Sequence, residues 1–337
     1  MNNVARFSPE QLEDIFTRPQ LAKRFHPVVA EKDFWVCWLL KQLFSISELE
    51  GWLTFKGGTS LSKCFGLIQR FSEDIDLAVN YERLGYVGDK NPRQADLSQT
   101  KRRILLDEML ADCQQYIAGP LLTILAKRIT EILGHNQWSL KVCNEDPNVL
   151  EFSYPKSVSG YLQYIHPVVS LELGTHAEPI PSDIYPITPY AAEAFPDLFK
   201  EPSWPIRTVV ARRTFWEKAT ILHAEYYRPL EKTMLPRYSR HWADLAVMSQ
   251  TSVKNEALKD LPLLEAVCLH KDRFYHCGWA NYNSAKPDSI HLLPHPERLA
   301  DLRRDYNSMS VMFFDNPMSF NTILEQLSAL EKEINSL

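Results

Sequence analysis

The sequence FKGGTSLSKCFGLIQRFSEDIDLAV, residues 55–79, carries the strongest structural signal in the chain. Residues 52–55 form a short β-prone run that stops at Gly57-Gly58, and residues 59–67 are predicted to form a short helix. Two glycines allow backbone amides to approach an oxyanion closely, and a helix N-terminus adds partial positive charge. The turn is therefore a candidate phosphate site, with a plain strand-to-helix turn as the alternative. The spacing of a P-loop is absent.

The second half of this stretch places two aspartates two residues apart. Asp74 and Asp76 alternate with apolar residues in a β-prone run, residues 74–79, so they are predicted to point to the same face of a strand. Carboxylates held together repel, and each disfavours ionisation of the other unless a cation lies between them. Mg²⁺ prefers oxygen ligands, commonly one or two carboxylates together with substrate phosphates. A solvated strand edge is the alternative for this pair considered alone.

A third acid, Glu172, lies between two leucines in another strand-like run, residues 168–173. Considered by itself it is an exposed acid on a strand. Combined with Asp74 and Asp76, it supplies the third carboxylate that a metal site would need.

Together, these residues resemble the nucleotidyltransferase superfamily of the DNA polymerase β type. The closer resemblance is to the AbiEii/AbiGii toxin family of bacterial nucleotidyltransferases. It is carried by residues 55–61 and 70–77, by Glu31-Lys32-Asp33 upstream, and by residues 216–220 and 240–245 downstream. The resemblance covers residues 31 to 250.

The resemblance implies an α/β (α+β) fold. Residues 1–195 would form a nucleotidyltransferase core with N-terminal helices and a mixed sheet flanked by helices, and residues 196–337 a mainly helical C-terminal lobe. It implies Mg²⁺, with Mn²⁺ as the alternative, and a nucleoside triphosphate as co-substrate. The implied catalytic residues are Asp74, Asp76, Glu172, Lys218 and Asp244, of which the first three would hold the metal. The implied nucleotide- and phosphate-binding residues are Lys56, Gly57, Gly58, Thr59, Ser60, Lys63, Arg70 and Ser72.

The predicted function is that of a toxin in a toxin–antitoxin system. It would transfer a nucleotide to an RNA acceptor, with the tRNA 3′ end favoured, and release pyrophosphate; an antitoxin encoded beside it would be its partner. A local concentration of arginines in an acidic chain favours an RNA acceptor: Arg207, Arg212, Arg213, Arg237 and Arg240. The alternatives are transfer to a small molecule or a protein, and a non-catalytic nucleotide-binding regulatory module. For Asp244, an ion pair with Arg240 four residues earlier is the alternative to a catalytic role.

Composition limits the class of protein. The 337 residues contain 37 Lys+Arg and 42 Asp+Glu, a net charge of −5, so binding of nucleic acid through bulk charge is excluded. The longest uninterrupted apolar run, Phe34–Leu40, is too short to span a bilayer, and the N-terminus has no secretory pattern. Six cysteines without a C-x-x-C pair fit reduced thiols. We expect a cytoplasmic protein without membrane contact.

The rest of the chain is predicted to be helical over residues 8–47 and 102–133, the latter interrupted at Gly119-Pro120. Seven prolines between residues 179 and 205 predict an ordered connector or binding loop, because proline disfavours long helices and interior strands. Further helices are predicted at residues 214–227, 238–250, 255–270 and 322–336, and further strands at 138–142 and 149–154.

Overall fold

The computed structural model describes residues 1–68, 70–134, 137–159, 166–309, 312–314 and 317–337. These residues form two compact units. Unit 1 comprises Met1–Cys64 and Phe71–Val209, and unit 2 comprises Phe65–Arg70 and Val210–Leu337. The main boundary therefore comes at 209/210, after the position expected from sequence, and a short internal segment also belongs to unit 2.

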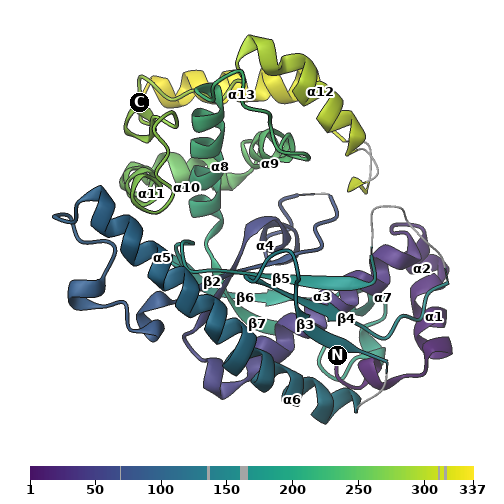
Figure 1. Cartoon of the computed structure of the whole chain (residues 1–337). Helices are drawn as coiled ribbons and strands as arrows, with labels where there is room; N and C mark the ends of the chain where they lie inside the picture. The colour runs from purple at the N-terminus through teal and green to yellow at the C-terminus, as the bar shows by residue number, and fades with distance from the viewer. Residues whose placement is uncertain (69, 135–136, 160–165, 310–311, 315–316) are drawn as a thin grey trace. The chain divides into compact units, whose positions relative to one another are not determined.

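Unit 1 is built on a mixed sheet with helices on it (Figure 1). Within the described residues the sheet has seven strands in the order β3-β4-β5-β2-β1-β7-β6. Strand β2 pairs in parallel with β5 and antiparallel with β1, and this pairing places β2 centrally. The predicted mixed sheet flanked by helices is confirmed. The strands are β1 (Leu53–Lys56), β2 (Ile75–Val79), β3 (Ser139–Val142), β4 (Val149–Ser153), β5 (Val168–Gly174), β6 (Ser182–Ile187) and β7 (Trp204–Val209).

Helix α3 (Pro27–Ser45) is the core helix of unit 1. Every residue from Phe34 to Leu43 is buried, as the apolar pattern predicts. The helix packs on β5 and β7, and Trp38 stacks on Phe152 of β4 with ring centroids 5.8 Å apart. Large aromatic side chains of this kind bury the most apolar area per residue and so dominate core packing.

Two features of the other unit 1 helices match the sequence signals, whereas the helical stretch predicted for residues 8–47 is three separate α-helices and the helix at residues 190–194 has no counterpart in the prediction. Ser8 and Gln11 form a reciprocal capping box at the start of α1. The predicted interruption at Gly119-Pro120 is a π-helical turn, Ile117–Leu121, between two α-helices. The helices are α1 (Pro9–Thr17), α2 (Pro19–Ala22), α4 (Gly57–Lys63), α5 (Gln99–Tyr116), α6 (Leu122–Leu133) and α7 (Tyr190–Ala194).

The proline-rich stretch corrects one sequence prediction. Instead of a connector, it contains β6 and β7, and β7 is an interior strand between β1 and β6. Pro186 lies on β6, an edge strand of the kind in which proline is tolerated. Pro205 lies near the start of β7, whereas β7 meets β1 near its other end, at Phe55↔Thr208. The prolines therefore occupy positions that tolerate them.

Unit 2 is mainly helical, with α8 packed against α9, α10 and α11. The single helix predicted for residues 255–270 is two helices, because α11 begins anew with Pro262 in its first turn. Helix α12 has no counterpart in the prediction. No helix among the described residues of either unit combines the length and apolar character that a membrane span requires. The helices are α8 (Ala211–Tyr226), α9 (Arg240–Met248), α10 (Ser252–Leu258), α11 (Leu261–Phe274), α12 (Leu299–Ser308) and α13 (Phe320–Asn335).

Candidate functional site

Three charged residues lie in one row across the centre of the sheet. Strand register pairs Lys56 of β1 with Asp76 of β2, and Asp76 with Glu172 of β5. Residues paired in this way project from the same face of a sheet. Asp76 is half-buried and Glu172 is exposed, whereas their neighbours along both strands include fully buried apolar residues. Asp74, two residues before Asp76, is also half-buried. The sheet therefore places Asp76 and Glu172 side by side. Both lie on the face of the sheet opposite to that of the buried apolar residues next to them in the chain.

Gly57 lies directly against the side chain of Asp76. Its φ is +78°, a left-handed conformation that favours glycine. A Cβ atom at this position would overlap the Asp76 carboxylate. Two independent constraints therefore require glycine here, and the glycine turn and the Asp-x-Asp strand form one local structure.

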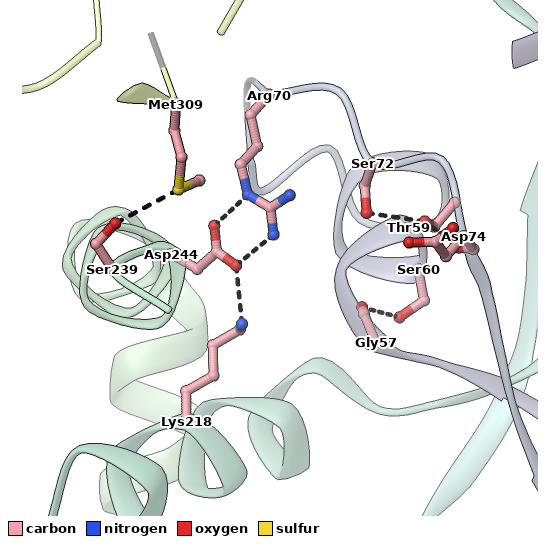
Figure 2. Close-up of polar contacts among 10 residues, drawn as sticks. All are labelled: Gly57, Thr59, Ser60, Arg70, Ser72, Asp74, Lys218, Ser239, Asp244 and Met309. Carbon is pink, nitrogen blue, oxygen red and sulfur yellow. Dashed lines mark hydrogen bonds and ion pairs between the residues drawn. The ribbon is translucent and has the colours of Figure 1, made fainter. Parts of the chain in front are cut away.

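The hydroxyls that follow the glycines hold this structure together. Thr59 Oγ1 donates to the backbone oxygen of Asp74 at 2.5 Å and lies 2.9 Å from Ser72 Oγ (Figure 2). Ser60 Oγ donates to the backbone oxygen of Gly57 at 2.8 Å. Thr59 and Ser60 are fully buried. They fix the turn against β2, which differs from the direct phosphate contact predicted for them; Ser72 is half-buried.

Lys63, at the end of α4, forms an ion pair inside unit 1. Its ammonium lies 2.8 Å from Asp33 Oδ1 and 3.6 Å from the centroid of the Tyr190 ring, with both charged side chains 4% exposed. Burial by itself lowers the pKa of Lys63, but the Asp33 carboxylate outweighs it and raises that pKa above its usual range. The charge is thus neutralised locally, and its position does not support the predicted phosphate contact.

In unit 2, Asp244 lies between two cations (Figure 2). The Arg70 guanidinium binds its carboxylate in bidentate fashion, Nε to Oδ1 at 2.8 Å and Nη2 to Oδ2 at 2.8 Å. Lys218 Nζ donates to Oδ2 at 2.8 Å. All three side chains are at most 7% exposed. The cluster therefore holds two positive charges and one negative charge in a buried setting.

This arrangement of charges shifts the pKa values of Asp244 and Lys218. Burial by itself raises the pKa of Asp244, but Arg70 and Lys218 outweigh it and hold that pKa well below its usual range. Burial lowers the pKa of Lys218, and the Arg70 charge lowers it further against the opposing effect of Asp244. Asp244 is thus ionised at all physiological pH values, so it orients Lys218 and Arg70 and cannot act as a general acid.

The predicted site residues therefore form two groups, one in each unit. The acidic row, defined as Asp74, Asp76 and Glu172, and the glycine turn at Gly57 and Gly58 belong to unit 1, and Lys218 and Asp244 belong to unit 2. Arg70 joins the second group, where it binds Asp244; its predicted phosphate contact stays a prediction. Sequence spacing offered Arg240 as the partner of Asp244, and no local pattern indicates a partner 174 residues away.

The donor chemistry of the acidic row fits a hard divalent cation. Among the described residues, no three His, Cys, Asp or Glu side chains are gathered closely enough to hold a metal ion as they stand. Mg²⁺ is usually bound by one or two carboxylates, with substrate phosphates and water completing the shell, so a preformed protein cage is not required. Asp76 and Glu172 in register, with Asp74 beside them, supply carboxylates of the right kind.

Comparison with known proteins agrees with this arrangement. A family model described as the nucleotidyl transferase AbiEii toxin of type IV toxin–antitoxin systems matches residues 38–326. Among solved structures, the nucleotidyltransferase toxin MenT4 from Mycobacterium tuberculosis H37Rv is similar, with a TM-score of 0.51 and 15% identity over 98% of this chain and 90% of that one. The comparison with curated proteins found no match.

Proposed function

Because the chain belongs to the AbiEii family of nucleotidyltransferase toxins of type IV toxin–antitoxin systems, we propose that it transfers a nucleotide to the 3′ end of an RNA, with tRNA as the expected acceptor. The 3′ hydroxyl oxygen would form a bond to the α-phosphorus of a nucleoside triphosphate, and the bond from that phosphorus to pyrophosphate would break. The proposal rests chiefly on the register of Asp76 with Glu172 and on the contact of Gly57 with Asp76.

Asp74, Asp76 and Glu172 are the proposed metal ligands. A bound Mg²⁺, with Mn²⁺ as the alternative, would neutralise charge on the triphosphate. Glu172, the most exposed of the three, is also suited to accept the proton of the attacking hydroxyl at a carboxylate oxygen. Gly57 and Gly58 would bring backbone amides to the phosphates, and Lys56, at the end of the same row, would add a positive charge.

Lys218 is the proposed phosphate-neutralising cation of unit 2. An ammonium has three donors, and one of them is directed to Asp244. In the Arg70–Asp244–Lys218 cluster two cations bind one carboxylate, and positive charge of this kind would stabilise an anionic ligand. Asp244 would keep Lys218 oriented without changing its own protonation.

The arginines predicted to bind the acceptor differ in their surroundings. Arg213 is 2% exposed and binds Glu217, and Arg212 pairs with Asp260, so neither supports binding of an RNA backbone. Arg207 is exposed, and Arg237 and Arg240 are half-exposed. These three arginines carry the electrostatic part of the acceptor proposal.

Trp279 adds an aromatic surface of the type that stacks on bases. Arg228 lies 4.7 Å and Lys232 5.8 Å from the centroid of its ring. A base can stack on an aromatic ring flanked by cations, and such contacts tolerate any sequence. We therefore include Trp279 among the candidate acceptor residues.

As a toxin of a toxin–antitoxin system, the chain has an antitoxin as its partner. We propose that the antitoxin is encoded in the neighbouring gene and that the toxin acts in the cytoplasm, where nucleoside triphosphates and tRNA are present.

The test is transfer of label from each of the four α-³²P-labelled triphosphates, with Mg²⁺, to total RNA, to a panel of small hydroxyl compounds and to protein. We expect labelled RNA of tRNA length, with yield that falls steeply between low and moderate salt because phosphate contacts release counterions. The D74N/D76N double variant should abolish labelling, and D183N, an exposed acid on the edge strand β6, should not. If a small compound or a protein is labelled and no RNA product forms at any salt concentration, the proposal of an RNA acceptor is wrong.

A further inference from the structure

Three consecutive charged residues near the start of α3 are buried in unit 1. Glu31, Lys32 and Asp33 are 1%, 3% and 3% exposed. A buried charge is costly unless it is paired and hydrogen-bonded. Successive residues of a helix point in different directions, so each of these three contacts a different segment of the chain.

Lys32 reaches the residue immediately before the first aspartate of the acidic row. Its ammonium donates to Glu73 Oε2 at 2.5 Å, and the two side chains are 4% and 13% exposed. Glu73 is joined directly to Asp74, so an ion pair that anchors Glu73 on α3 also restrains the backbone from which the Asp74 side chain projects.

Asp33 reaches the last residue of the glycine helix. Its Oδ1 pairs with Lys63 at 2.8 Å, and its Oδ2 accepts from the backbone N–H of Tyr190 at 2.7 Å. Both carboxylate oxygens are thus used, and Lys63 is enclosed further by the Tyr190 ring. A buried pair with this much support holds the end of α4 on α3.

These two pairs lie at the two ends of one connection. Between Cys64 and Phe71 the chain leaves unit 1 and returns to it. Lys63 is the last residue of α4 before this excursion, and Glu73 precedes Asp74 shortly after it. Adjacent residues of one helix therefore fix the points where the chain departs from the glycine helix and re-enters the acidic strand.

We propose that Lys32 and Asp33 are positioning residues for the metal-binding carboxylates: they hold α4 and Asp74 in place through Lys63 and Glu73, without touching substrate. The inference rests on the proposed function. Both residues precede the segment matched by the family model, residues 38–326. The polar groups that ligate a metal depend on outer partners for their orientation, and loss of such a partner weakens metal binding.

The test uses the double variant K32M/E73Q. E73Q keeps the side-chain length and K32M shortens it by one atom; together they remove both charges, so no unpaired charge is left in the interior. The readouts are binding of Mn²⁺ followed by electron paramagnetic resonance, kcat and KM for nucleotide transfer, and the midpoint of thermal unfolding. We expect Mn²⁺ affinity to fall by about 10-fold or more, as for other losses of an outer partner, and kcat to fall more than the triphosphate KM rises. The single variant K32R, which keeps the positive charge, should retain most of the Mn²⁺ affinity of the wild-type protein.

E31Q is the matched control. Glu31 is adjacent to Lys32 and equally buried, but its Oε1 accepts from Ser157 N, Ser157 Oγ and Val158 N, outside the connection between α4 and β2. E31Q should lower the unfolding midpoint and leave Mn²⁺ affinity unchanged. If K32M/E73Q, shown to be folded, binds Mn²⁺ and turns over as the wild type does, the positioning role is wrong. If the wild-type protein binds Mn²⁺ but labels no acceptor, the proposed function fails, and Mn²⁺ affinity alone still decides the positioning role.

Discussion

Asp244 receives Arg70 on both carboxylate oxygens and Lys218 on one of them, so a single buried acid balances two cations from segments that are 174 and 26 residues away in sequence. The arrangement is asymmetric. Removal of Asp244 takes the shared carboxylate away from two buried cations, whereas removal of Lys218 leaves the bidentate Arg70–Asp244 pair in place. Stability and function should therefore respond differently to the two substitutions.

The first prediction follows from this asymmetry. D244N should lower the free energy of unfolding by about 3–5 kcal/mol, the usual effect of breaking a buried pair, and K218M should lower it by clearly less. Urea denaturation followed by circular dichroism measures both. Equal losses of unfolding free energy for the two variants would mean that Asp244 does not balance the charges of both Arg70 and Lys218. In the transfer assay, K218A should impair triphosphate use more than K218R, because arginine keeps the positive charge.

The second prediction concerns Gly57. G57A should abolish nucleotide transfer and Mn²⁺ binding, because the added methyl group overlaps the Asp76 carboxylate and the φ of +78° is unfavourable for alanine. Gly85 is the matched control: its φ is +89°, but among the described residues no atom beyond its chain neighbours lies within 4 Å of the position that a Cβ would take. G85A should therefore lose only the conformational term, about 1–2 kcal/mol of stability, and retain activity. Normal activity in G57A would show that the contact with Asp76 is not functional.

The third prediction concerns the acidic row itself. D76N should reduce kcat by at least about 10²-fold, the effect of removing one strong electrostatic group from an active site. The unfolding midpoint should stay the same or rise, because removing one of several neighbouring carboxylates relieves their repulsion. A variant that loses activity only because it unfolds would contradict this account, and differential scanning fluorimetry without metal separates the two cases.

The fourth prediction is a pH dependence of stability that originates in His223. Its Nδ1 accepts from the backbone N–H of His291 at 3.0 Å, so Nε2 carries the proton and donates to Asn281 O at 3.1 Å. Burial, together with the nearby His291, lowers the pKa of His223 to about 4 although the bond to Asn281 opposes the shift. The unfolded chain binds a proton near pH 6.5 and the folded chain does not until about pH 4.

Stability should therefore fall as pH decreases from about 6.5 to about 4, with His223 contributing at most about 3 kcal/mol over that interval. His241 and His176, both half-buried, also have lowered pKa values and add to the same slope. H223N should reduce the slope between pH 6.5 and 4 without removing it. Chemical denaturation at several pH values measures the slope, and an unchanged slope in H223N would show that His223 does not carry it.

Local sequence patterns were sufficient for the elements around the site, because β1, β2 and β5 are each built from strongly β-prone runs and the glycines mark the turn. They could not supply the register of β2 with β5, since parallel partners far apart in the chain share no local signal. The pairing of Asp76 with Glu172 therefore needed the structure.

The cations near the glycine turn are a second case in which local sequence could not indicate a distant partner. Lys63 and Arg70 both lie close to the glycines in sequence, and proximity alone favoured phosphate as their partner. In the structure Lys63 pairs with Asp33 and Arg70 pairs with Asp244, both on distant segments that sequence proximity could not indicate. The prolines of β6 and β7 misled for a related reason, because whether a proline is tolerated depends on which strand lies beside it.

The excursion of the chain at residues 65–70 also constrains how this protein can be divided. A gene truncated at the 209/210 boundary would encode a C-terminal fragment without Arg70, and in that fragment Asp244 would retain only Lys218 of its two cations. Neither unit is thus a contiguous module that recombination could exchange at a single junction. A separately produced helical unit would need residues 65–70 in addition to residues 210–337 to keep the Arg70–Asp244 pair.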